Sequence, residues 1–221
     1  MTSLKRIFST LMLGLLAVAL SPAALAAEPP ITWLMNAGYA APVGTTADYL
    51  QGGWTLGGGF AVKLQPSSPF SVQFDLSYAD FQATTKLISL GQAQTQFRID
   101  DGRGEVWSLT AAGKYTAPFS NGVHGYGLLG IGAYHRYIEL TQTALGGGYV
   151  CDPWWGYCYP ALVEGDVVIA NKSQTKFGWN FGLGVEFPLR YGGAWFLEAR
   201  YHWIDGDKQT EFVPIQIGYR F

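Results

Sequence analysis

The residues best suited to chemistry are charged and polar side chains that occur singly within apolar, alternating segments. They are Lys63, Asp75, Lys114, Asn180, Glu186, Glu198, Arg200 and Arg220. Both signs of charge are present, so these groups could form ion pairs or line a path for ions. Charges removed from bulk water need partners of opposite charge and hydrogen bonds. What they do therefore depends on the elements that carry them.

A second group lies in the segment Cys-Asp-Pro-Trp-Trp-Gly-Tyr-Cys, whose first and last residues are the two cysteines of the chain, Cys151 and Cys158. An even cysteine count in an oxidising compartment favours a disulfide. The pair lacks a nearby histidine and zinc-type spacing, so no metal site is expected. The disulfide would hold four aromatic residues in a compact group, here called the aromatic knob. The aromatic knob is Trp154, Trp155, Tyr157 and Tyr159.

The first 26 residues have the pattern of a secretory signal peptide. Lys5 and Arg6 form a basic start, residues 7–20 form an apolar stretch, and residues 24–26 read Ala-Leu-Ala. The apolar stretch is short for a membrane-spanning helix, which needs about 20 residues. Cleavage after Ala26 is therefore expected. This places the mature chain in an oxidising compartment, with residues 27–30 as a short lead.

Composition excludes several functional classes. Two of the 14 basic residues lie in the signal peptide, which leaves 12 against 16 acidic residues and a formal net charge of −4. A chain of this charge has no basic stripe for nucleic acid. After the signal peptide no apolar run approaches the roughly 18 residues of a transmembrane helix. Abundant glycine and aromatic residues instead favour many short strands with tight turns.

Alternation of apolar and polar residues predicts eight strands. The predicted strands are 31–40, 54–64, 70–81, 105–116, 125–140, 174–187, 195–203 and 213–221. Short turns are expected at 66–69, 118–123 and 190–193. They alternate with connections that are mostly longer, at about 42–53, 84–104, 141–173 and 205–208. This arrangement predicts an all-β, eight-stranded antiparallel up-and-down transmembrane β-barrel over residues 31–221, with the longer connections as extracellular loops.

The large aromatic residues indicate which face of each strand points outward. They belong to the apolar face and concentrate towards the strand ends, as at Trp54, Tyr78 and Trp107. The interior of eight strands is only wide enough to be filled by side chains, so these rings would not fit there. We therefore expect them to contact lipid. A soluble barrel with an apolar interior is the alternative.

The small and polar face would then line the lumen. Lys63, Lys114, Glu186 and Arg220 would lie near the short turns or the C-terminus, with the other predicted lumen residues about half-way up. Paired charges would fill the narrow barrel with a polar network. The alternative is a small ion or solute channel.

The chain resembles small bacterial outer-membrane barrels of the opacity-protein, attachment-protein and outer-membrane-protein-A membrane-domain type. The resemblance rests on the signal peptide and on segments 126–133, 177–187, 197–201 and 218–221. It implies an integral outer-membrane protein, with Tyr219 and Phe221 in the C-terminal signal read by the barrel-assembly machinery. Expected partners are outer-membrane lipid, lipopolysaccharide, periplasmic chaperones during insertion, and a host or surface ligand of unknown identity. No nucleic acid and no cofactor are expected, and a monomer is expected.

The same resemblance leaves the activity open. Proteins of this type serve in adhesion or in envelope structure, and some small outer-membrane barrels modify lipid A. The lipid A deacylases resemble one another in a lipid-facing His followed two residues later by Ser. His124, His135 and His202 are followed at that distance by Tyr, Tyr and Ile. A non-catalytic role in envelope structure or surface interaction is therefore expected. The aromatic knob would provide a binding surface, or would pack on neighbouring loops or on lipopolysaccharide.

Overall fold

The computed structural model describes residues 31–65, 68–95, 98–119, 122–152, 156–190, 192–206 and 209–221. The predicted signal peptide and the lead at 27–30 lie outside this description. No helix in the described ranges is long and apolar enough to cross a membrane.

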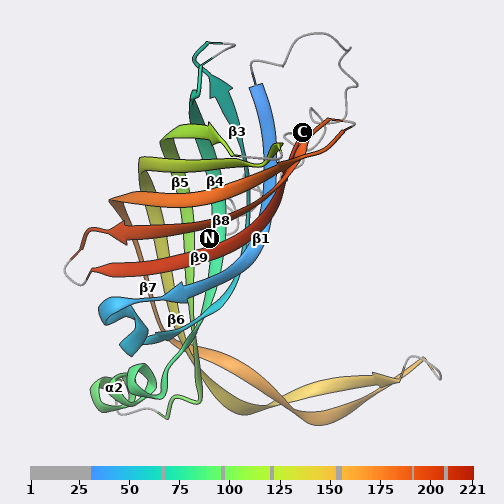
Figure 1. Cartoon of the computed structure of the whole chain (residues 1–221). Coiled ribbons are helices and arrows are strands. Elements are labelled where there is room, and N and C mark those ends of the chain that lie inside the picture. Colours follow the sequence, from blue (N-terminus) through green and yellow to red (C-terminus); the bar gives the residue numbers. More distant parts are fainter. Residues whose placement is uncertain are drawn as a thin grey trace.

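Eight long strands form a closed antiparallel ring (Figure 1). They are β1 (Ile31–Pro42), β3 (Gly53–Lys63), β4 (Phe70–Ala83), β5 (Asp101–Pro118), β6 (His124–Asp152), β7 (Tyr157–Pro188), β8 (Ala194–Ile204) and β9 (Thr210–Arg220). The ring runs β1, β3, β4, β5, β6, β7, β8, β9 and returns to β1, while the short β2 (Leu50–Gln51) pairs with β4. The predicted eight-stranded up-and-down barrel is confirmed.

The ring closes where the first and last strands meet. β1 and β9 pair from Leu34 and Arg220 to Pro42 and Phe212. Beyond that register, the backbones of Trp33 and Phe221 exchange two hydrogen bonds, both 3.0 Å long. The last residue of the chain is therefore part of the seam.

The two faces of the wall differ as the alternation predicted. The rings of Trp54, Tyr78 and Trp107 form a row on the outer face, with centroids 5.1 and 4.8 Å apart. Glycines on the inner face are closely packed: a Cβ added to Gly38 would lie 2.0 Å from the carbonyl oxygen of Ile215. A Cβ on the outward Gly113 would meet nothing closer than 3.9 Å. Small inward residues therefore allow the strands to curl into a narrow barrel.

The two ends of the barrel are unequal. One, here called the turn end, carries the connections β3–β4, β5–β6 and β7–β8 and the C-terminus, and the other, the loop end, carries the remaining connections, of which β1–β3 and β4–β5 are long. At the loop end lie the 3₁₀ helix η1 (Gly44–Asp48) and the helix α2 (Thr85–Thr95). Lys86 pairs with Asp48 at 3.0 Å, and Thr84 donates a hydrogen bond to the Asp48 carbonyl, which ties these two connections together.

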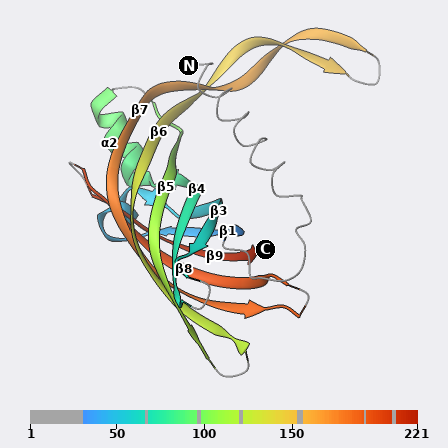
Figure 2. The ribbon, with the colours of Figure 1, turned by 90° about the horizontal axis from the view of Figure 1, so that it is seen from above.

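The connection predicted at 141–173 is not an irregular loop. β6 and β7 continue through it and pair as far as Asp152 and Tyr157 (Figures 1 and 2). One extra residue, Ile169, forms a bulge at the base, because Leu140 faces Ala170 whereas Thr141 faces Val168. Bulges bend and twist a strand pair. The part beyond this bulge, 141–152 and 157–168, is here called the ribbon.

Candidate functional site

The centre of the lumen is a buried ion-pair cluster on Arg200. Its guanidinium lies 2.8 Å from Asp75 Oδ2 and 2.7 Å from Glu198 Oε1, and all three side chains are at least nine-tenths buried. Nη1 also lies 3.5 Å from Thr110 Oγ1, and Gln73 Nε2 donates to Asp75 at 2.9 Å. Three strands meet here, because Arg200 and Glu198 come from β8, Asp75 and Gln73 from β4, and Thr110 from β5, which pairs with β4.

A second cluster lies nearer the turn end. Glu186 on β7 pairs with both Lys114 on β5 and Arg220 on β9. The two cations also lie over the Tyr126 ring, with Lys114 Nζ 4.2 Å and Arg220 Cζ 4.9 Å from its centroid. Cations over an aromatic face are attracted by the ring quadrupole. Two positive groups therefore share one carboxylate and one ring.

Two uncharged side chains join these clusters into one network. Tyr126 Oη donates to Glu198 Oε2 at 2.9 Å. Gln73 Oε1 accepts from Arg220 Nη2 at 3.2 Å, while its amide nitrogen donates to Asp75. The network thus runs unbroken from Lys114 at one level to Arg200 at the next.

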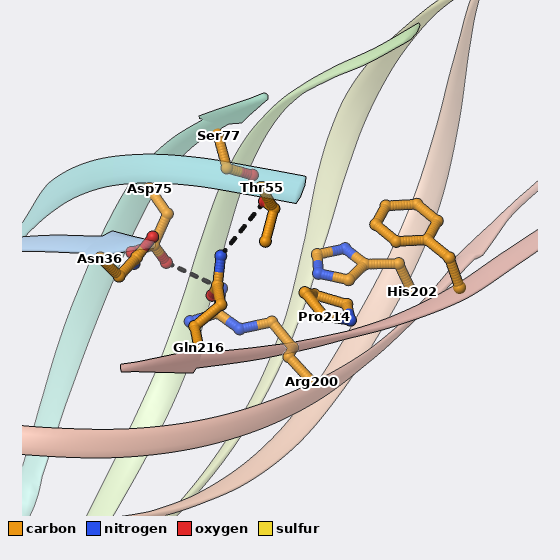
Figure 3. A pocket seen from close by; sticks show the side chains of 9 residues that line it. Asn36, Thr55, Asp75, Ser77, Arg200, His202, Pro214 and Gln216 are labelled. Atoms are coloured by element: carbon orange, nitrogen blue, oxygen red, sulfur yellow. Dashed lines mark hydrogen bonds and ion pairs between the residues drawn. The ribbon is translucent and has the colours of Figure 1, made fainter. Parts of the chain in front are cut away.

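A small polar cavity borders the Arg200 cluster (Figure 3). Its lining residues are Asn36, Thr55, Asp75, Ser77, Arg200, His202, Phe212, Pro214 and Gln216. Gln216 Nε2 lies 3.4 Å from Thr55 Oγ1. Asn36 Oδ1 is buried and accepts no hydrogen bond from the described residues. A polar space with an unpaired acceptor suits ordered water.

Apolar side chains lie on both sides of the Arg200 cluster. At the loop end, buried residues form one cluster against which Leu87 of α2 packs. Its members are Ala40, Leu50, Ala79, Phe81, Val106, Tyr134, Ile204 and Phe212. At the turn end the cluster is Leu34, Ala112, Tyr126, Leu128 and Phe196. The loop-end side of Arg200 is therefore apolar, whereas on its turn-end side aromatic rings and charges share one level, with Arg220 over the Phe196 ring.

The structure brings together six of the eight predicted lumen residues. The remaining two also face inward, and Lys63 interacts electrostatically with Glu186 of the turn-end cluster. Asn180 donates to Tyr134 Oη at 3.4 Å, and Lys63 is half-buried on the inner face of β3 near the turn end. Sequence reasoning missed the uncharged connectors Gln73 and Tyr126. Both have the parity of the inward residues of their strands, which was the available signal.

The histidines occupy different environments. His202 is buried in the lumen, where Nδ1 lies 2.9 Å from Tyr134 Oη and the ring stacks on Phe212 at 4.7 Å. His135 is on the outer face, 2.9 Å from Thr175 Oγ1. Neither has a serine or carboxylate partner among the described contacts. The described residues also hold no cluster of three or more His, Cys, Asp or Glu side chains that could bind a metal.

A contrasting ion pair lies on the outer face at the loop end. Arg103 Nε is 2.5 Å from Asp80 Oδ1 and 3.6 Å from Glu105 Oε1, with half of the arginine side chain exposed. Its hydrogen bond to Asp80 raises the pKa of Arg103. This group is not connected to the lumen, because Asp80 and Arg103 have outward parity on β4 and β5.

The predicted disulfide is present at the end of the ribbon. Cys151 and Cys158 are bonded and face one another across β6 and β7. Of the aromatic knob, Tyr157 is 67% exposed and Tyr159 lies on β7 opposite Val150. Trp154 and Trp155 lie outside the described residues. The role of the aromatic knob as a binding surface stays a prediction.

The chain belongs to the outer membrane protein beta-barrel domain family, whose family model matches residues 10–221. It is an integral outer-membrane barrel, as the sequence predicted. No curated protein sequence matches the chain.

Solved structures with TM-scores of 0.51 share the fold at low sequence identity. Neisserial surface protein A is 12% identical with a TM-score of 0.51, over 86% of this chain and 96% of that one. A major outer membrane protein from Thermus thermophilus is 12% identical with a TM-score of 0.51, over 86% and 98%. The attachment invasion locus protein of Yersinia pestis is 16% identical with a TM-score of 0.42, over 86% and 98%.

Proposed function

We propose that this protein is a non-catalytic outer-membrane barrel with an occluded lumen, and that it acts through its loop end. The observation that carries the proposal is the buried ion-pair cluster on Arg200, which has apolar side chains on both sides. A group that conducts ions or transfers a proton needs access to water or substrate, and Arg200, Glu198 and Asp75 are all buried.

A channel is the less favoured alternative because apolar side chains crowd the lumen on both sides of the Arg200 cluster. Phe81, Phe212 and Tyr134 lie on the loop-end side, and Phe196 and Leu128 on the turn-end side. Hydrophobic constrictions of this kind exclude ions by dewetting. Salt-bridged side chains inside eight strands also leave little room for open water.

The loop end offers the surface for interaction. The ribbon projects beyond every other strand (Figures 1 and 2), and Tyr149 and Tyr157 are 75% and 67% exposed. Exposed aromatic side chains on a disulfide-held scaffold bury much area at little entropic cost when they bind. Envelope structure or attachment to a surface ligand is therefore the proposed role, with lipopolysaccharide as the nearest neighbour of the ribbon.

Deleting the ribbon tests this proposal. Cells that display the full chain are compared with cells whose chain joins Thr141 to Val168 through a short Gly-Ser turn, in assays of host-cell and serum-component binding. Loss of binding with the barrel still heat-modifiable on gels supports the proposal. Equal binding by both would contradict it.

Mass spectrometry of lipid A tests the absence of catalysis. Lipid A from cells with and without the protein should carry the same acyl groups. A change in acyl number that depended on His135 or His202 would assign an enzyme. Assembly is tested separately, since deletion of Phe221 should reduce insertion if the barrel-assembly machinery reads Tyr219 and Phe221.

A further inference from the structure

The two long edges of the ribbon differ in chemistry. β5 pairs with β6 only as far as Asp101 and Thr141, and β8 pairs with β7 only from Ile204 and Gly178. Within the described residues, no strand continues beside either edge of the ribbon. Both edges therefore leave backbone N–H and C=O groups unpaired by other strands, which is a template for a further strand.

The outer edge of β7 carries several features that block strand addition. Pro160 lacks an N–H group, and Glu164, Asp166 and Lys172 are charged. The Ile169 bulge interrupts the edge. Charges, proline and bulges are the devices by which proteins protect edge strands. If two such edges paired antiparallel about residue 165, Glu164 of each copy would also lie opposite Asp166 of the other.

The outer edge of β6 has none of these features. Residues 142–151 read Gln-Thr-Ala-Leu-Gly-Gly-Gly-Tyr-Val-Cys, without charge or proline. Among the described residues, contacts to this edge lie at its base, where Asp100 N donates to the Thr141 carbonyl at 3.0 Å and Thr143 N donates to Asp100 Oδ2 at 3.1 Å.

The register shows which backbone groups face outward. Thr143 N points away from β7, so alternation directs the backbone groups of residues 145, 147, 149 and 151 the same way. The Cα atoms of Cys151 and Cys158 are 4.0 Å apart, as expected for a pair that exchanges no backbone hydrogen bonds. Both observations assign the odd-numbered residues to the free edge.

We propose that two copies of this chain associate through the free edge of β6, antiparallel and centred on Gly147, so that their ribbons form one four-stranded sheet. This register places residue 145 of each copy opposite Tyr149 of the other. All of these positions have outward backbone groups, and no like charges meet. An isolated two-stranded ribbon is marginally stable in water, whereas three or more strands are self-supporting. The barrel closes without a partner, so barrel closure alone predicts a monomer. The proposed dimer depends on the ribbon instead.

Sedimentation velocity of the full mature chain in detergent, over a range of protein concentration, tests the association. The wild-type chain should form dimers. Gly147→Lys places two ammonium groups side by side at the dyad, and Gly147→Pro removes an outward N–H without touching the pairing with β7. Both should raise the dimer dissociation constant at least about tenfold.

Leu162→Lys is the matched control, because residue 162 faces Gly147 across the ribbon and lies on the outer edge of β7. It adds the same charge at the same height and should leave the dissociation constant unchanged. Heat-modifiable migration verifies the barrel in each variant. A wild-type chain that stays monomeric at every concentration, or equal weakening by Leu162→Lys, would overturn the proposal.

Photocrosslinking in outer membranes locates the contact. A photoreactive amino acid at position 149 should give a dimer crosslinked to residues 141–152 of a second copy. The same group at position 157, near the end of the ribbon, should give none. Crosslinks from position 149 to a different protein would also overturn the proposal.

Discussion

The lumen and the ribbon solve the problem of unpaired polar groups in opposite ways. In the lumen, Arg200 pairs with Asp75 and Glu198, and Gln73 and Tyr126 use their remaining hydrogen-bonding capacity to reach neighbouring clusters. In the ribbon, long edges of β6 and β7 have no neighbouring strand within the described residues. Water can solvate the ribbon, whereas the side chains of Arg200, Asp75 and Glu198 are at least nine-tenths buried.

The difference predicts how free energy is distributed over the molecule. An unpaired backbone group in lipid costs several kcal/mol, so the closed ladder of the barrel resists local opening. A ribbon in water can open at much lower cost. Substitutions in the lumen should therefore affect the stability of the whole barrel, and substitutions in the ribbon should affect only the ribbon.

The largest effect is expected from Arg200→Ala. It leaves Asp75 and Glu198 buried without their cation, which should cost about 3–5 kcal/mol of unfolding free energy. Arg103→Ala removes the half-exposed pair with Asp80 and should cost about 0–1 kcal/mol. Urea unfolding of both variants in lipid vesicles, followed by tryptophan fluorescence, measures the contrast. Equal losses would refute the claim that the lumen network is desolvated.

A smaller effect is expected from filling the inner face. Gly38→Ala directs a methyl group at the Ile215 carbonyl, and overpacking of this kind costs about 1–3 kcal/mol. Gly113→Ala on the outer face has room for the same methyl group and should be within about 0.5 kcal/mol of wild type. Urea midpoints compare the two. A Gly113 variant as unstable as the Gly38 variant would show that strand propensity, not lumen space, decides the outcome.

The smallest effect on the barrel is expected from Cys151→Ser with Cys158→Ser. The barrel should insert and keep its urea midpoint, while amide hydrogens of the ribbon exchange faster. Closing so short a loop is worth about 2–3 kcal/mol in the chain-entropy model, and only the ribbon feels it. Hydrogen exchange with mass spectrometry reads both regions in one experiment. Faster exchange in β8 and β9 would show that the two regions are coupled.

The sequence could predict the wall of the barrel because alternation is a local signal. The strand at 70–81 follows from period two, and the size of the side chains then indicates which of its faces points inward. A local pattern does not predict which inward side chains contact one another. Arg200 reaches Asp75, 125 residues earlier, because barrel curvature and strand stagger bring β8 and β4 across the lumen.

The ribbon and α2 were harder to predict for a different reason. Gly146, Gly147 and Gly148 break the alternation within β6, and Pro160 does so within β7, so this segment resembles a loop. The β6–β7 pairing that holds it begins inside the barrel and continues outward. In α2, Gly91 interrupts the helix pattern. Gly91 lies close to Ile99 and Leu140, and this contact depends on the tertiary structure, which a local pattern does not contain.

Planar-bilayer recording tests most directly whether the lumen is occluded. Purified, folded protein should give no stable conductance steps in a membrane where a known porin conducts. The expected result follows from the paired charges on Arg200 and the apolar clusters at both levels. Steady, ion-selective openings whose conductance changed in Glu198→Ala or Arg200→Ala would contradict the occluded lumen and identify a channel.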